Sequence, residues 1–344
     1  MITAINFAVA NVCSAKCVYC PTDRGDESSE QILSFDVFKK VIDEISSEEF
    51  QNKNDLNTIR LGENGDMFLN KSILDMFRMV RAKLPKVRIE LYNHFTKFKP
   101  ELSAIFLEEK LMDAVYMNVD GVGENYVSVK HASYEKCMDN LGAFIRKRDE
   151  LGMIVPISIR ALTMKSYVET VRANFDADPG QVPKEILDTQ DDYHLVKEEL
   201  DRLLNPAQDG FKRGTMHMWG ERETLAHLEI NEKDYSCPML NRVESEAYIS
   251  PEGEWYVCCL DSKQEVKIGS VVKNTLQDLI DGDRRKEILD NLHSRDFSKI
   301  GGPCKTVHCC QVYFPNPFFS RIMRTLMGFN FIAQKAYTWY KTKI

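Results

Sequence analysis

Three cysteines lie within eight residues near the start of the chain, in the segment Cys13-Ser-Ala-Lys-Cys17-Val-Tyr-Cys20. Thiolates grouped in one loop are typical ligands of zinc or of an iron-sulfur cluster. On a four-iron cluster, three cysteines leave one iron open to a substrate or cofactor. A zinc knuckle, a disulfide with one thiol left over and chance clustering are the alternatives. The nearest histidine in the sequence is His94, so a knuckle lacks an adjacent fourth ligand, and the spacing favours a reactive cluster.

A second group of thiols lies between residues 237 and 310. It comprises Cys237, Cys258, Cys259, Cys304, Cys309 and Cys310. Residues 246–259 contain two alternating stretches joined by Pro-Glu-Gly, which predicts a β-hairpin with cysteines at its end. A short strand at 267–271 and helices at 275–281 and 284–292 complete the module. The thiols favour a second metal site, with a zinc ribbon as the structural alternative. Cys137 lies on the apolar side of a predicted helix and is assigned to the core.

Strands and helices alternate ahead of this module. The sequence predicts strands at 2–9, 58–61, 87–92, 114–119 and 155–162. It predicts helices from Ser34, at 71–84, at 101–109, at 134–151 and from about residue 166. Such alternation is typical of a parallel sheet covered by helices, the α/β class. Residues 173–213 depart from this alternation of strands and helices. Their sequence predicts an insertion with an acidic helix at 191–204, ahead of a sixth strand.

The loops after these strands are the places to look for a site, because ligands of parallel sheets gather at the carboxyl ends of the strands. The turn Gly62-Glu63-Asn-Gly65-Asp66 follows the second strand. Its glycines let the backbone approach a ligand, and its carboxylates can pair with an ammonium group. Arg160 alternates with apolar neighbours in the fifth strand, which predicts a buried arginine that needs an anionic partner. His217 and Trp219, near the sixth strand, are candidates for substrate contact.

The composition is that of a globular protein, with 344 residues, 43% hydrophobic and 28% charged. No basic start followed by an apolar run indicates a signal peptide, so we expect a cytoplasmic protein whose cysteines serve metals. The net charge of -7 makes nucleic acid an unexpected partner. Residues 297–344 contain no Asp or Glu and seven Lys or Arg. This basic, aromatic end is expected to pack against the body, with contact with an anionic membrane surface or a lipid-linked substrate as the alternative.

The first cysteine group, C-x3-C-x2-C with Tyr19 before its last cysteine, resembles the signature of the radical S-adenosylmethionine (SAM) superfamily. The resemblance implies a partial (β/α)6 barrel and a four-iron cluster on Cys13, Cys17 and Cys20 that binds SAM. It implies that Glu63 or Asp66, with Gly62 and Gly65, holds the SAM amino group. It also implies SAM-binding roles for other strand-end residues. These are Asn93, Asn118 or Asp120 at the ribose, and Lys130 at the carboxylate, where relatives usually have Arg.

The second cysteine group, C-x15-G-x4-C followed by Asp261, resembles the SPASM/twitch extension of these enzymes. The resemblance implies one auxiliary four-iron cluster held by Cys237, Cys258, Cys304 and either Cys309 or Cys310. Cys259 is a spare ligand or a hydrogen-atom donor on this reading. The expected domains are the barrel at 1–235, the module at 236–312 and a basic helical tail at 313–344.

Together these resemblances imply reductive cleavage of SAM to a 5'-deoxyadenosyl radical, hydrogen abstraction from the substrate and oxidation by the auxiliary cluster. The electron would come from a reductant such as flavodoxin or ferredoxin. The expected substrate is a sugar, an aminocyclitol or a similar small molecule. Peptide modification and epimerisation are the alternative reactions, and a zinc-dependent structural protein is the alternative without catalysis.

Overall fold

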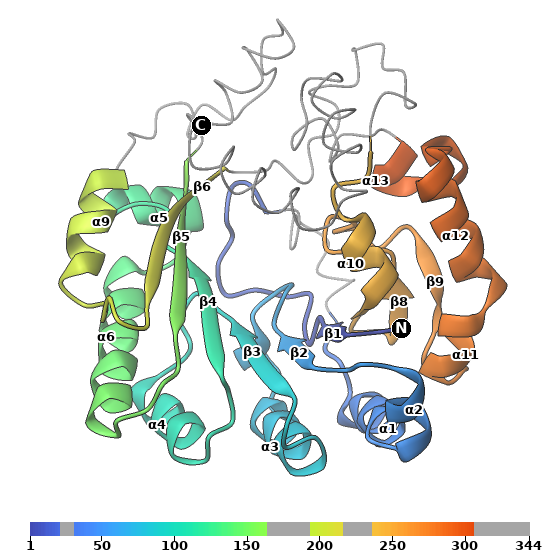
Figure 1. Ribbon diagram of the computed structural model, residues 1–344. Helices are drawn as coiled ribbons and strands as arrows, with labels where there is room; N and C mark the ends of the chain where they lie inside the picture. Colours follow the sequence, from blue (N-terminus) through green and yellow to red (C-terminus); the bar gives the residue numbers. More distant parts are fainter. Residues whose placement is uncertain (21–30, 164–192, 216–235, 306–344) are drawn as a thin grey trace, which may run out of the picture.

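One sheet forms the centre of the protein. The structure, a computed structural model, describes residues 1–20, 31–163, 193–215 and 236–305. The strand order is β6-β5-β4-β3-β2-β1-β7-β8-β9 (Figure 1). The strands are β1 (Ala4–Phe7), β2 (Thr58–Leu61), β3 (Arg88–Tyr92), β4 (Ala114–Asn118), β5 (Ile157–Thr163), β6 (Gly210–Thr215), β7 (Glu246–Ile249), β8 (Glu254–Tyr256) and β9 (Lys267–Ser270). The neighbours from β6 to β7 are parallel, and β8 and β9 continue the sheet antiparallel.

Helices from the first part of the chain cover one side of this sheet (Figure 1). They are α1 (Phe35–Ile45), α3 (Ile73–Lys83), α4 (Pro100–Glu108) and α6 (Tyr134–Glu150), joined by the short α2 (Glu48–Lys53), η2 (Met67–Leu69) and α5 (Glu124–Lys130). Helix α9 (Tyr193–Asp201) precedes β6. The last part of the described chain forms α10 (Leu240–Ser245), α11 (Leu276–Asp281), α12 (Asp283–Ser294), η5 (Phe297–Lys299) and α13 (Gly302–Lys305).

Helix α1 shows how the sequence pattern produces this layer. Its N-cap Ser34 accepts a hydrogen bond from the amide of Val37, which satisfies one of the free N–H groups at the helix start. Its buried residues are Phe38, Val41, Ile42 and Ile45. The Phe38 ring lies 4.9 Å from that of Phe7 in β1. The 3.6-residue spacing of these apolar side chains therefore lets α1 pack against the outer face of the sheet. The predicted α/β fold is confirmed.

The two faces of the sheet differ in polarity. Apolar side chains at alternate positions, such as Ile59, Ile89, Val115 and Ile159, are fully buried in the hydrophobic core. The positions between them carry polar groups on the inner face. Those in β1 to β5 include Asn6, Arg60, Glu90, Tyr116, Asn118 and Arg160. Because side chains alternate along a strand, a polar inner face and an apolar outer face arise from the same residues.

Two features differ from the sequence-based expectation. The hairpin β7–β8 is present, but β7 also pairs parallel with β1, from Ala4 opposite Glu246 to Phe7 opposite Ile249. The C-terminal module therefore extends the main sheet. The insertion predicted up to residue 213 overlaps β6, which begins at Gly210. No helix in the described ranges is long and apolar enough to cross a membrane.

A buried ion pair fixes the far end of the sheet. The Arg148 side chain is fully buried, and its Nη1 and Nη2 lie 2.6 and 3.0 Å from the two carboxylate oxygens of Asp209. Asp209 also accepts hydrogen bonds from the amides of Ile157 and Asn205. One carboxylate therefore joins α6, the start of β5 and the turn into β6.

Replacing Asp209 with Asn is expected to lower the free energy of unfolding by about 3–5 kcal/mol, because the Arg148 charge stays buried without its partner. Anaerobic urea denaturation measures the change. Asp149→Asn is the matched control, since Asp149 contacts the same guanidinium but its side chain is 43% exposed. The control is expected to lose about 1 kcal/mol or less. Equal losses in both variants would contradict the assigned role of Asp209.

Candidate active site

The first cysteine loop leaves β1 at its carboxyl end and is fastened to α5. The amides of Lys16 and Val18 donate to the carbonyls of Lys130 and Val129, both over 3.0 Å. The amide of Cys20 donates to the Cys17 carbonyl and closes a turn. Cys13, Cys17 and Cys20 are thiols of intermediate exposure. Backbone hydrogen bonds thus hold three reachable thiols at the edge where parallel sheets bind ligands.

Burial disfavours the charged form of the thiols of Cys13 and Cys17, whose pKa values are raised. Burial raises the pKa of Cys13 to about 12; the Ala15 amide, 3.4 Å from its sulfur, opposes the shift, and charge on Asp66, Cys17 and Cys20 adds to it. Three thiolates here need a compensating positive charge, which a metal centre supplies. In the described part of the chain, no three Cys, His, Asp or Glu residues are grouped around a point that suits a single metal ion. Three thiols within one loop match, in number and spacing, the donor set expected for a four-iron cluster with one open iron.

The turn after β2 lies against this loop. Gly62 and Gly65 have positive φ angles of 90° and 69°. A Cβ atom at Gly65 would come within 2.3 Å of the Ala10 carbonyl oxygen, so only glycine fits. The Asp66 amide donates to the Val12 carbonyl over 2.8 Å. The structure therefore brings the predicted glycine turn and the cysteine loop together.

The two acids of this turn have different surroundings. Asp66 is completely buried and accepts hydrogen bonds from Ser14, Asn93 and the Phe68 amide, with His94 Nε2 at 3.5 Å. Burial alone would raise the pKa of Asp66, but the hydrogen bonds from His94, Ser14 and Phe68 outweigh it and lower the pKa. Asp66 is thus used to connect the cysteine loop to the strand ends.

Glu63, by contrast, keeps an oxygen available. Its side chain is 9% exposed, and its Oε1 lies 3.5 Å from Arg242 Nη2. Among the described residues, no group hydrogen-bonds to its buried Oε2. Burial raises the pKa of Glu63 to about 7, although Arg242 and Arg60 act against the shift. Of the two rival acids, Glu63 is the one with capacity for a cationic ligand.

A buried polar cluster lies beside the cysteine loop and includes one of its residues. It consists of Tyr19, Asp120 and Lys130. The Tyr19 hydroxyl donates to Asp120 over 2.6 Å, and Lys130 Nζ lies 2.6 Å from the same carboxylate and 2.5 Å from the hydroxyl. Burial would lower the pKa of Lys130, but the charges of Asp120 and Cys17 prevail and raise it. Lys130 therefore remains charged beside Cys17, with its ammonium already paired to Asp120.

Other predicted residues occupy the same edge of the sheet. Asn93 is buried and bonds Asp66 and the Phe95 amide, so it stabilises the turn after β3. Asn118, the last residue of β4, is half-buried, and no side-chain hydrogen bond is found for it among the described residues. Between Asn118 and Asp120, Asn118 is the more available for a ligand. Arg160 lies on the inner face as predicted, but the prediction that it is buried is wrong, because its side chain is exposed.

His94 is a feature that the sequence did not assign to the site. Its Nε2 lies 3.7 Å from the Cys13 sulfur and 3.5 Å from the Ser14 hydroxyl, and its Nδ1 lies 2.8 Å from the Thr96 hydroxyl. Its position directly after Asn93 at a strand end was the available signal. Cys13 and His94 lie 81 positions apart in the sequence, so no local pattern indicates that they are neighbours.

The second cysteine group lies in the C-terminal module that contains the hairpin. Cys258 and Cys304 are buried at 6% and 8% exposure, and Cys237, three residues before α10, is half-buried. Asp261, fully buried, accepts from the amides of Glu265 and Val266 and shapes the turn after the paired cysteines. Cys309, Cys310, His217, Trp219 and the tail lie outside the described residues.

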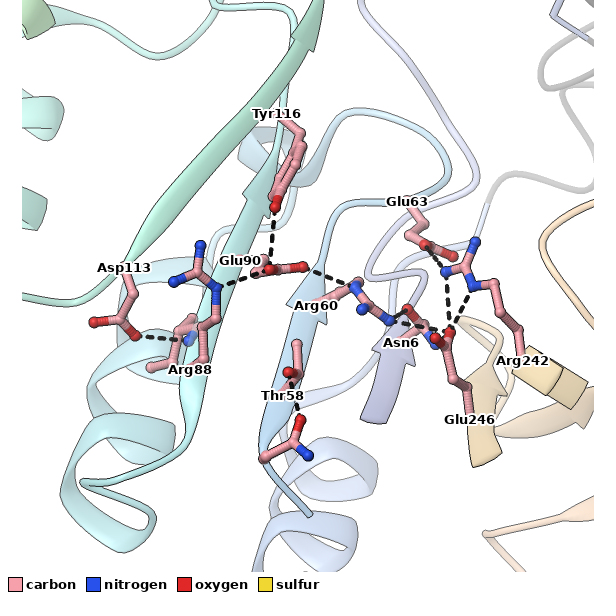
Figure 2. Close-up of polar contacts among 12 residues, drawn as sticks. Asn6, Thr58, Arg60, Glu63, Arg88, Glu90, Asp113, Tyr116, Arg242 and Glu246 are labelled. Carbon is pink, nitrogen blue, oxygen red and sulfur yellow. Dashed lines mark hydrogen bonds and ion pairs between the residues drawn. The ribbon is translucent and has the colours of Figure 1, made fainter. Parts of the chain in front are cut away.

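A chain of polar contacts crosses the inner face from β3 to α10 (Figure 2). Arg60 contacts Glu90 over 2.8 Å and Glu246 over 3.0 Å. Arg242 contacts Glu246 over 2.9 Å and reaches Glu63. This network, missed from the sequence, joins the glycine turn to the C-terminal module. Its signal was charge at alternate positions of otherwise buried strands.

Comparison with known proteins agrees with this geometry. Residues 237–311 match the SPASM family, an iron-sulfur cluster-binding domain. A solved structure of BtrN in complex with AdoMet and 2-DOIA is 14% identical, covers 89% of this chain and 92% of its own, and gives a TM-score of 0.51. Histidine-tagged anSMEcpe with bound AdoMet is 12% identical, with 83% and 79% coverage and a TM-score of 0.52. No curated protein matches the chain at a significant level.

A third solved structure has the same fold. Streptococcus suis SuiB bound to the precursor peptide SuiA is 12% identical, with 84% of this chain and 67% of that chain covered and a TM-score of 0.52. The predicted partial barrel and the predicted SPASM-type module are confirmed. The chain has the fold of the radical SAM enzymes BtrN, anSMEcpe and SuiB, and it carries a SPASM iron-sulfur cluster-binding domain.

Proposed function

We propose that this protein is a radical SAM oxidoreductase that dehydrogenates a small polar molecule such as a sugar or an aminocyclitol. The observation that carries the proposal is the loop of Cys13, Cys17 and Cys20, held at the carboxyl edge of this fold beside the Gly62–Asp66 turn. When bound, the two clusters supply an electron for reductive cleavage of SAM and an acceptor for the electron left on the substrate.

The residues around the loop have complementary roles in this proposal. Glu63 offers its unpartnered oxygen to the SAM ammonium, and Gly62 lets the ligand approach the backbone. Asn118 offers its amide to the ribose. Asp66 and Lys130, both already paired, hold the cysteine loop in place from its two sides. We therefore assign Asp66, Asp120 and Lys130 to positioning, and Glu63 and Asn118 to SAM binding.

The second cysteine group is assigned to the auxiliary cluster, with Cys237, Cys258, Cys304 and one of Cys309 or Cys310 as ligands. Loss of a hydrogen atom from a CH–OH carbon, followed by loss of one electron and one proton, turns the alcohol into a carbonyl. The network of Glu63 and Arg242 in Figure 2 connects the two regions that this sequence of steps requires. BtrN, crystallised with AdoMet and 2-DOIA, supports a small-molecule substrate.

Peptide modification is the second candidate. It is favoured by the equally similar SuiB structure, which contains a precursor peptide. Short peptides encoded beside the gene are the substrates to test for this alternative, and sugars or aminocyclitols are those to test for the first.

The proposed chemistry is tested by incubating anaerobically reconstituted, dithionite-reduced protein with SAM. We expect 5'-deoxyadenosine and methionine in equal amounts, quantified by liquid chromatography and mass spectrometry. A sample without dithionite is the control and is expected to form neither product. Protein that retains its iron but yields no 5'-deoxyadenosine would overturn the proposal.

A further inference from the structure

Arginines from two different parts of the chain act on the carboxylate of Glu63. The Glu63 side chain is 9% exposed, and among the described residues its Oε2 has no hydrogen-bond partner. The charges of Arg60, in β2, and of Arg242, in α10, both stabilise its ionised form. Arg242 belongs to the C-terminal module, which also carries the second cysteine group. One side chain of that module therefore reaches the turn that we assign to SAM.

Arg242 is held in place by groups of its own module. Its Nε and Nη2 lie 3.0 and 2.9 Å from Glu246 Oε2, and its guanidinium lies 5.6 Å from the centre of the Tyr248 ring. The same Nη2 lies 3.5 Å from Glu63 Oε1, so the guanidinium contacts both carboxylates (Figure 2). Because a guanidinium is planar and rigid, this arrangement also fixes the orientation of the Glu63 carboxylate.

Removing Arg242 would leave Glu63 as a buried acid without an ion pair. The described residues provide no other ion pair or hydrogen bond to its side chain. Burial raises the pKa of Glu63 to about 7, and Arg242 is the strongest of the charges that oppose this shift. Without Arg242, Glu63 would therefore take up a proton more readily. A protonated carboxyl group loses the charge that pairs with an ammonium ion.

The other groups that face Glu63 keep their charge state near pH 7. Burial would lower the pKa of Arg60, but the charges of Glu246 and Glu90 prevail and raise it. Burial would raise the pKa of Glu246, but Arg242 and Arg60 prevail and lower it. The remaining groups are neutral, and burial, with the charge of Glu63 adding to it, raises their pKa; they are Tyr92, Tyr248, Tyr256 and Cys259. Of the groups in this network, Glu63 is thus the one that titrates near pH 7.

We infer that Arg242 is a positioning residue for SAM and that it acts through Glu63. Arg242 keeps the Glu63 carboxylate charged and oriented for the SAM ammonium group. The inference rests on the proposed function, in which Glu63 binds that ammonium, and it adds that the C-terminal module contributes to SAM binding. The affinity for SAM therefore depends on α10 as well as on the first cysteine loop.

SAM affinity of the anaerobically reconstituted full-length protein tests this inference. It is measured by titration calorimetry with the clusters kept oxidised, so that SAM is not cleaved, and with the iron content checked in each sample. Near the pKa of Glu63, we expect Arg242→Gln to bind SAM at least about fivefold more weakly than wild type. The difference is expected to shrink at higher pH, because Glu63 then ionises without Arg242. Titration of SAM itself cancels when variant and wild type are compared at the same pH.

Arg284→Gln is the matched control, because it removes the same charge from α12 of the same module. Arg284 is 41% exposed and pairs with Glu287. The control is expected to bind SAM within about twofold of wild type. A double variant separates a role through Glu63 from general damage to the site. If Arg242 acts through Glu63, adding Arg242→Gln to Glu63→Gln is expected to change SAM affinity little.

Arg242→Lys keeps the charge, but a single ammonium cannot contact both carboxylates as the guanidinium does. We expect its SAM affinity to lie between those of wild type and Arg242→Gln, at least about twofold below wild type. This variant carries the test if Arg242→Gln does not retain its iron, and wild-type affinity in it would then overturn the inference.

Three further results would also overturn the inference. They are wild-type affinity in Arg242→Gln, equal weakening in Arg242→Gln and Arg284→Gln, and full additivity of Arg242→Gln with Glu63→Gln. Unchanged SAM binding in Glu63→Gln would instead contradict the role of Glu63 in the proposed function. SAM binding is measured without SAM cleavage, so failure of the radical chemistry and failure of this inference give different results.

Discussion

Replacing Cys13, Cys17 and Cys20 together with alanine is expected to lower the iron content of the anaerobically prepared protein from about eight to about four per chain. The same variant is expected to form no 5'-deoxyadenosine from SAM. The reason is that the three thiols share one loop, fastened to α5 and to the Gly62–Asp66 turn, so no other described cysteine can replace them. Iron, sulfide and zinc analysis gives the first result, and product analysis gives the second.

Cys137→Ala is the matched control for this prediction. Cys137 is a fully buried thiol of α6, and it lies in the hydrophobic core outside both cysteine groups of the sequence. Its replacement is expected to leave the iron content and SAM cleavage unchanged. Zinc in place of iron in the wild-type protein, or a triple variant with undiminished iron, would exclude the radical mechanism and favour a metal-stabilised binding protein.

Much of the fold follows from short-range patterns. The strand at 58–61 and the helix at 134–150 are found within a residue of their predicted bounds, because their apolar spacing and the N-cap of the helix, Ser133, act locally. The cysteine loop is also local, since its three ligands lie within eight residues. The sequence does not predict the pairing of strands that are far apart along the chain. The contact of β7 with β1 joins residues about 240 positions apart, and no local signal specifies it.

In the candidate site, too, the sequence identifies the candidate residues, and only the fold shows which contacts they make. The sequence indicates that Glu63 and Asp66 are rivals, but only the fold shows that Ser14, Asn93 and Phe68 already bond Asp66 while Glu63 keeps a free oxygen. The network of Arg60, Arg242 and Glu246 depends on strand register and is equally invisible to the sequence. Tertiary contacts decide which of two similar groups is available for a ligand.

The adjacent cysteines Cys258 and Cys259, which follow β8, are also expected to differ in whether they bind a cluster. Cys258→Ala is expected to lose about four of about eight irons and to abolish substrate oxidation, while SAM cleavage by the first cluster persists. The reason is that Cys258 is buried in the module together with Cys304, the position of a cluster ligand. Iron analysis and 5'-deoxyadenosine formation distinguish this outcome from general unfolding, which would remove both.

Cys259→Ala supplies the matched control within the same pair. The Cys259 sulfur lies 3.5 Å from Arg242 Nη1, on the side of the module that contacts Glu63 and Glu246. Because its thiol faces this arginine, its removal is expected to leave about eight irons per chain. If Cys259→Ala instead loses the irons and Cys258→Ala keeps them, Cys259 is the ligand, and Arg242 then lies against the auxiliary cluster itself.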